Sequence, residues 1–132
     1  SNSSSSSFIM ISKNELTSEK LQEIFGLPKG HILEDIGLEV GKTLLNCGEK
    51  CTLEEFLDNY GYTLEDLDEE ITSGHGGKFF ALAKEAHEKG WYIYTGSCSD
   101  EGWGTDGMEA FLCNRDLDIS NEDLAIYKEG GY

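Results

Sequence analysis

The chain has 132 residues, of which 26 are Asp or Glu and 10 are Lys or Arg, so its formal net charge is −16. This charge argues against DNA, RNA and anionic membranes as ligands, because those are bound through Lys and Arg that neutralise phosphates. It permits a basic partner, and no apolar stretch approaches the roughly 18 residues of a transmembrane helix. We therefore expect a cytoplasmic protein that binds neither nucleic acid nor membrane directly.

The first ten residues are expected to lie outside the fold. They form a serine-rich run that ends at Met10, and such a run is typical of a linker or cloning scar. The chain becomes polar soon after Ile11, which excludes the apolar core of a secretory signal. The sequence therefore predicts a linker over residues 1–10 and a single small globular domain over residues 11–132.

Three helices are predicted by a start signal that recurs along the chain. A threonine precedes carboxylates, so its hydroxyl can accept a free N–H while a carboxylate complements the positive end of the helix dipole. Each helix is followed by a glycine, a common residue just past a helix end. The predicted helices lie near residues 18–25, 53–60 and 64–72, after Thr17, Thr52 and Thr63.

A fourth helix is predicted near residues 78–89, before Gly90. It carries one apolar face, formed by Phe79, Leu82, Ala83 and Ala86. The apolar residues between 31 and 45 are compatible either with a helix or with two short strands.

The C-terminal third differs in residue composition. Residues 91–95 are aromatic and β-branched and form the clearest predicted strand, and residues 108–113 form a second. Residues 124–127 are either a last strand or a helix capped by Ser120. We predict an α+β fold, in which several short capped helices from the N-terminal two-thirds pack on a small antiparallel sheet from the C-terminal third.

The strongest local feature is an acidic block without Lys or Arg. Like charges one helical turn apart destabilise a helix by a few tenths of a kcal/mol, so helix stability does not explain the block. It is either a solvated helix face or a docking surface for a basic protein, and we adopt the second as a hypothesis. Trp103, in a glycine-rich loop, is the candidate apolar anchor. The predicted partner-binding carboxylates are Glu54, Glu55, Asp58, Glu65, Asp66, Asp68, Glu69 and Glu70.

The four cysteines leave several interpretations open. They are inert thiols, a disulfide or redox pair, or the ligands of a zinc ion, although the spacing lacks a second close pair. A zinc site would use Cys47, Cys51, Cys98 and Cys113. The three histidines are scattered and no catalytic set can be assembled, so we expect a protein without enzymatic activity.

Residues 53–67, Leu-Glu-Glu-Phe-Leu-Asp-Asn-Tyr-Gly-Tyr-Thr-Leu-Glu-Asp-Leu, resemble the recognition part of the long leader peptides of ribosomally made, modified peptides. The pair Gly130-Gly131 resembles their double-glycine cleavage site. This resemblance implies a precursor role, but only Tyr132 follows, which leaves no core peptide. The preferred hypothesis is a small acidic inhibitor of a basic nuclease or other nucleic-acid-binding protein, acting as an immunity protein or an anti-defence protein by charge mimicry. A zinc-binding or adaptor protein is the alternative.

Overall fold

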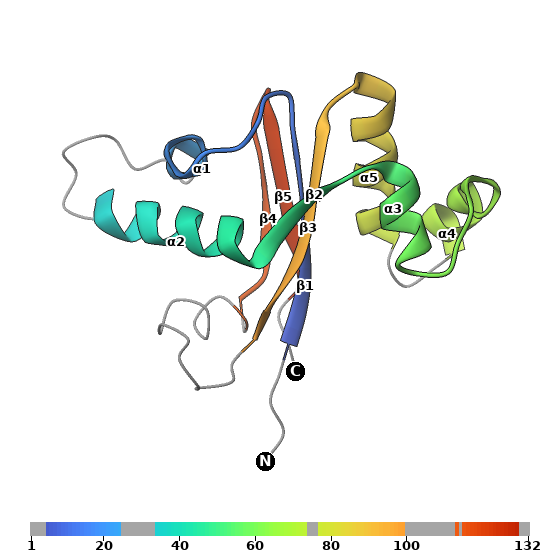
Figure 1. Cartoon of the computed structure of the whole chain (residues 1–132), viewed down its shortest axis with the longest axis horizontal. Helices are drawn as coiled ribbons and strands as arrows, with labels where there is room; N and C mark the ends of the chain where they lie inside the picture. The colour runs from blue at the N-terminus through green and yellow to red at the C-terminus, as the bar shows by residue number, and fades with distance from the viewer. Residues whose placement is uncertain (1–4, 25–33, 74–76, 100–112, 114, 130–132) are drawn as a thin grey trace, which may run out of the picture.

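The computed structural model describes residues 5–24, 34–73, 77–99, 113 and 115–129 (Figure 1). Within these residues, five strands form one antiparallel sheet with the order β2-β3-β1-β5-β4. The strands are β1 (Ser5–Ser12), β2 (Gly48–Cys51), β3 (Tyr92–Ser99), β4 (Leu117–Ser120) and β5 (Leu124–Lys128). The helices are α1 (Ser18–Ile24), α2 (Glu34–Cys47), α3 (Leu53–Asp58), the 3-10 helix η1 (Leu64–Asp66), α4 (Leu67–Ser73) and α5 (Gly77–Lys89). The predicted α+β class is confirmed.

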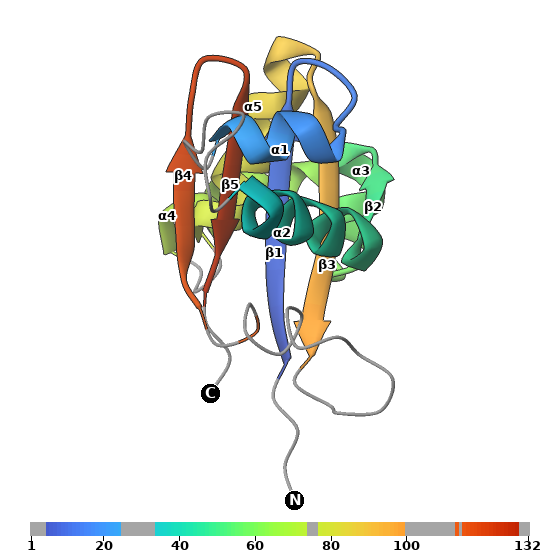
Figure 2. The same ribbon diagram turned by 90° about the vertical axis from the view of Figure 1, so that its left-hand side faces the viewer.

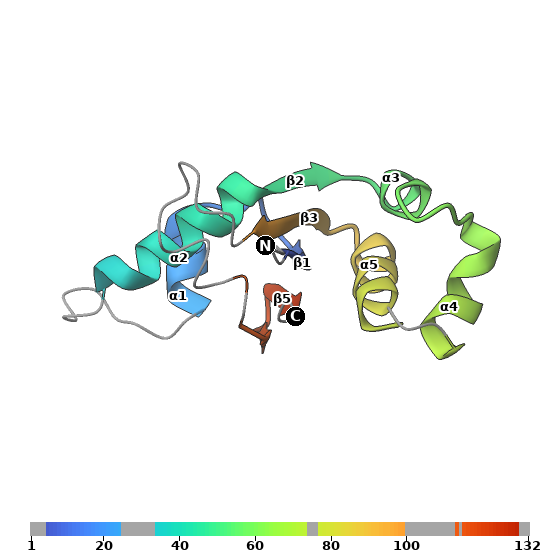
Figure 3. The same ribbon diagram turned by 90° about the horizontal axis from the view of Figure 1, so that it is seen from below.

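The sheet separates two helical layers. Helices α1 and α2 cover one face, and α3, α4 and α5 lie on the other (Figures 2 and 3). Each layer has its own core: one contains Phe8 and Met10 of β1, and the other contains Ile9 and Ile11 of the same strand. We call the two sides the α1–α2 face and the α3–α5 face.

The expectation that residues 1–10 lie outside the fold is wrong for residues 5–10. They form most of β1, the central strand, which pairs with β3 on one side and β5 on the other. The residues from Phe8 to Ile11 are at most 1% exposed. Four apolar residues without alternation are typical of a strand buried on both faces. Buried Ser6 fits the core because its hydroxyl donates to the Cys113 carbonyl at 2.9 Å.

The predicted helices are present with small shifts at their ends. The capping box at Thr52 is complete: its N–H donates to Glu55 at 3.0 Å, and its hydroxyl accepts from the Glu55 N–H at 3.1 Å. At Thr63, both the N–H and the hydroxyl donate to the Asp66 carboxylate, and the first turn is 3-10 before α4 begins. The ambiguous segment is helical from residue 34 onward, as α2. On α5, Leu82, Ala83 and Ala86 are buried as predicted.

The predicted helix start at Ser120 is wrong, because the alternative of a last strand is the one that forms. Ser120 ends β4, and a short turn leads into β5, where burial alternates along the strand. The Asn121 side chain accepts from the Asp123 N–H at 2.8 Å, and the Asn121 N–H donates to the Leu124 carbonyl, which closes a hairpin. A short polar residue bonding two residues ahead favours a turn as readily as a helix cap. Of the strand predicted over 108–113, residues 108–112 lie outside the described residues.

Candidate partner-binding surface

The acidic block lies on α3, η1 and α4, at the outer side of the α3–α5 face (Figures 1 and 3). Helix α3 is held by its buried side, formed by Leu53, Phe56 and Leu57. Phe56 packs edge-on against Phe80 of α5, with ring centroids 5.5 Å apart, and Tyr60 and Tyr62 also contact Phe80. Because the apolar side of α3 faces this aromatic cluster, the carboxylates are directed outward.

Local partners can be named for Glu55, Asp66, Asp68 and Glu70. Glu55 and Asp66 cap helix starts, as described above. Asp68 accepts a hydrogen bond from Lys84 of α5 at 2.8 Å, so a base from another helix reaches a block that contains none in sequence. Glu70 is hydrogen-bonded to Tyr62. These interactions occupy the four side chains and stabilise the local arrangement of the helices.

Three other carboxylates surround a hollow of about 450 Å³ between α3 and η1, which we call the α3–η1 hollow. Its apolar lining includes Leu57 and Leu64, and Leu64 is 51% exposed. Among the lining residues that the structure describes, there is no Lys, Arg or His. The acidic rim consists of Glu54, Asp58 and Glu65, all of them exposed.

Tyr62 also lines this hollow, close to further carboxylates outside the lining. The Glu70 carboxylate raises the pKa of Tyr62, mainly by electrostatic repulsion of the phenolate. Burial, the hydrogen bond to Glu70 and the charge of Asp66 raise this pKa further. A site that disfavours a phenolate favours a cation for the same reason.

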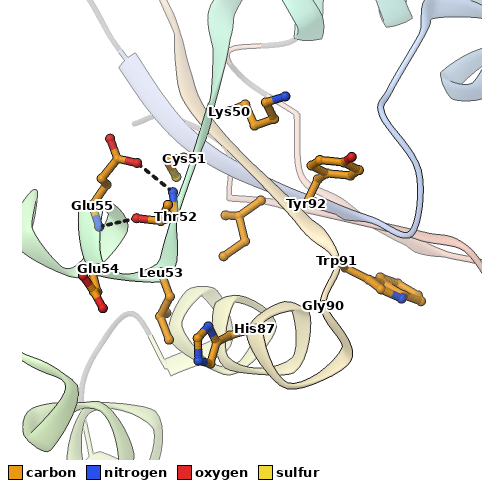
Figure 4. A pocket seen from close by; sticks show the side chains of 11 residues that line it. Lys50, Cys51, Thr52, Leu53, Glu54, Glu55, His87, Gly90, Trp91 and Tyr92 are labelled. Carbon is orange, nitrogen blue, oxygen red and sulfur yellow. Dashed lines mark hydrogen bonds between the residues drawn. The ribbon is translucent and has the colours of Figure 1, made fainter.

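A second hollow, of about 680 Å³, lies where α3 begins beside β3, and we call it the α3–β3 hollow (Figure 4). Leu53 and Ile93, each 3% exposed, form its base. Trp91 and Tyr92 lie on one side, and Glu54 on the other (Figure 4). Sequence reasoning missed this hollow. The only signal in the sequence is the aromatic pair directly after Gly90, which equally indicates a strand.

The cysteines do not form the zinc site considered from the sequence. Cys98 and Cys113 belong to the core of the α1–α2 face, whereas Cys51 packs against the core of the opposite face. Among the described residues, which include all four cysteines, there is no group of three or more His, Cys, Asp or Glu side chains placed to hold a metal ion. The sheet lies between Cys51 and the pair Cys98 and Cys113. A zinc site that uses all four thiols would therefore require rearrangement of the sheet.

Two predicted residues remain, Glu69 and Trp103. Glu69 lies on α4 and is exposed. Trp103, the predicted apolar anchor, lies outside the described residues, so its role stays a prediction.

No family model, curated protein or solved structure matches this chain. In the part of the chain that the structure describes, no helix is long and apolar enough to cross a membrane. Any inference about function therefore depends on the geometry and charge of the surface itself.

Proposed function

We propose that this chain is a small acidic binding protein that neutralises a basic partner, such as a nuclease or another nucleic-acid-binding protein. The partner's Lys and Arg side chains would contact α3 and η1 in place of nucleic acid. An immunity protein against a toxin and an anti-defence inhibitor both fit this description. Either would act without enzymatic activity, in the cytoplasm where its partner meets nucleic acid.

The α3–η1 hollow is the observation that carries this proposal. It combines three exposed carboxylates with an apolar base, and its described lining residues include no positive side chain. The long side chains of Arg and Lys have the matching structure, because an apolar stem carries a charged end. Carboxylates bind the planar guanidinium of Arg in two-point contacts, which favours Arg over Lys.

The protein's overall charge supports the same proposal. A net charge of −16 steers a cationic partner over a distance of about one Debye length, roughly 10 Å at 0.1 M salt. Interfaces of this type associate fast at low salt and more slowly as salt is added.

The test is capture of partners by the immobilised protein at two salt concentrations, from the native host and from its competitor. We expect a basic nucleic-acid-binding protein that is retained at low salt and released at high salt. The purified partner should lose nucleic-acid binding or cleavage when the acidic protein is added. Retention of only neutral or acidic proteins, or a captured nuclease with unchanged activity, would contradict the proposal.

A matched pair of variants separates the proposed surface from net charge. The first carries Glu54→Gln, Asp58→Asn and Glu65→Gln. The second carries Glu19→Gln, Glu23→Gln and Asp35→Asn, which neutralise three exposed carboxylates of α1 and α2. Both change the net charge by three, but only the first should weaken inhibition. These positions avoid Asp66 and Glu70, which hold the local structure.

A further inference from the structure

The α3–β3 hollow differs from the α3–η1 hollow in its chemistry. Its base is apolar, with the buried side chains of Leu53 and Ile93, and its walls include Trp91 and Tyr92. At about 680 Å³ it is within the range of roughly 300–1,000 Å³ that is usual for ligand pockets. It is therefore large enough for an aromatic side chain.

Lys50, which lines this hollow, already has partners. The Lys50 ammonium lies 2.7 Å from the Glu15 carboxylate and 5.1 Å from the centre of the Tyr92 ring. On the other side of the hollow, Glu54 and Glu55 are exposed (Figure 4). Glu55 also accepts from the Thr52 N–H, drawn as a dashed line in Figure 4, whereas Glu54 has no such capping role.

Cys51 forms part of the wall as a neutral thiol. Burial raises its pKa, a hydrogen bond with Thr95 lowers it, and the charges of Glu55 and Glu49 raise it further. A neutral thiol behaves as a small apolar group, so this wall adds apolar surface rather than a nucleophile.

Glu54 joins the two hollows, because it lines both of them. A basic segment that contacts Glu54 and Asp58 would therefore lie beside the apolar base of the α3–β3 hollow. In protein interfaces a few residues, enriched in Trp, Tyr and Arg and packed in pockets that exclude water, carry most of the binding energy.

We infer that the α3–β3 hollow receives an aromatic side chain carried by the basic segment of the partner. This inference rests on the proposed function and specifies the partner's contact sequence, a bulky apolar residue flanked by Lys or Arg. The carboxylates of α3 provide the attraction, and the hollow provides selectivity among basic segments.

The test uses two synthetic pentapeptides, acetylated and amidated, with two basic residues on each side of a central phenylalanine or alanine. We expect the phenylalanine peptide to bind at least about tenfold more tightly, because a phenyl ring leaves water. In NMR spectra, its ring protons should show NOEs to the methyl groups of Leu53 and Ile93. A third peptide, with serines in place of the basic residues, should bind at least tenfold more weakly than the phenylalanine peptide.

Two variants test whether the preference for the phenylalanine peptide arises in the α3–β3 hollow. Tyr92→Ala removes one wall and Cys51→Leu fills part of the hollow, and each should reduce the preference for phenylalanine to about threefold or less. Ile36→Ala is the control, since Ile36 is a large exposed apolar residue on α2, across the sheet. It should leave the preference intact.

The possible failures are distinguishable. Equal, salt-sensitive binding of the two basic peptides would overturn the aromatic anchor and leave the proposed acidic surface standing. Tight binding of the serine peptide would mean that the hollow takes a small apolar ligand without charge, which contradicts the inference. Absence of binding by either basic peptide at low salt would also overturn it, whereas the proposed function is judged separately by partner capture.

Discussion

The two faces of the sheet offer two different settings for a charged group, a buried lysine on one face and a block of exposed or half-buried carboxylates on the other. On the α1–α2 face, Lys128 is 1% exposed, and its ammonium donates to the main-chain carbonyls of Cys113 and Arg115. On the α3–α5 face, the carboxylates between residues 54 and 70 are exposed or half-buried. A buried charge is tolerated only when hydrogen bonds replace water, whereas an exposed one costs little and acts at a distance. The proposed recognition surface lies on the second face, where charge is exposed.

The largest predicted effect concerns β1, which both faces share. Deleting residues 1–11 removes this central strand from Ser5 to Ile11 and exposes both cores. We expect a chain without a cooperative thermal transition, as measured by circular dichroism. Deleting only residues 1–4 is the control and should leave the transition in place. A folded protein after the longer deletion would show that β1 does not join the two faces.

The second prediction tests how firmly the α3–α5 face, which carries the proposed recognition surface, is anchored. Phe56 is 1% exposed and packs against Phe80, so Phe56→Ala should lower the free energy of unfolding by about 3–5 kcal/mol. Urea unfolding measures this loss. Phe79→Ala, at a half-buried position against the Tyr127 ring, should cost less. An equal loss of unfolding free energy in Phe56→Ala and Phe79→Ala would contradict a particular role of α3 in the core.

The third prediction concerns Lys128. Burial lowers its pKa, an effect that the nearby Cys98, Cys113 and Asp116 partly offset. Between this lowered pKa and the ordinary lysine value, the unfolded chain binds more protons than the folded one, so stability rises with pH across that interval. Lys128→Met keeps an apolar stem and removes the ammonium, which should abolish this rise. It should also cost about 1–3 kcal/mol at neutral pH, because two carbonyls lose their donor.

Chemical unfolding of both proteins as a function of pH provides the measurement. The comparison must be a difference between variant and parent, because a hydrogen bond to Glu129 helps to raise the pKa of Tyr127 to about 12. A raised tyrosine pKa makes stability fall as pH rises toward that value, opposite to the Lys128 effect. An unchanged pH dependence in Lys128→Met would contradict the buried-charge account of the α1–α2 face.

Local signals in the sequence were enough to predict the helices near the acidic block. Thr52 and Glu55 lie three residues apart, and their reciprocal hydrogen bonds need nothing distant in the chain. The same local pattern gave a wrong prediction of a helix start at Ser120, because pairing of β4 with β5 outweighs a potential helix cap. The serine-rich start of β1 also concealed its burial, since Ser6 finds its partner, Cys113, more than a hundred residues away.

The site could be predicted only in part for a similar reason. The sequence places the carboxylates on α3, η1 and α4, but the ion pair between Asp68 and Lys84 depends on how α4 packs against α5. The α3–β3 hollow depends on pairing between Cys51 and Ile93, which brings distant segments together. Long-range pairing of this kind leaves no periodic signal in one sequence.

The smallest effect on stability is expected from the variants of the α3–η1 hollow. Neutralising Glu54, Asp58 and Glu65 should change the free energy of unfolding by only about 0.5 kcal/mol or less, because exposed substitutions rarely cost more. Thermal unfolding of this triple variant, beside that of the Glu19, Glu23 and Asp35 control, measures the change. A large loss would assign these side chains to the structure and not to recognition.

The association rate with the captured basic partner is the most direct test of the account. At low salt, neutralising Glu54, Asp58 and Glu65 should slow association at least about tenfold, and the difference should shrink as salt is added. The control triple on α1 and α2 should have a much smaller effect, although its net charge is the same. Equal slowing by both triples, or no slowing by the first, would contradict a recognition surface on α3 and η1.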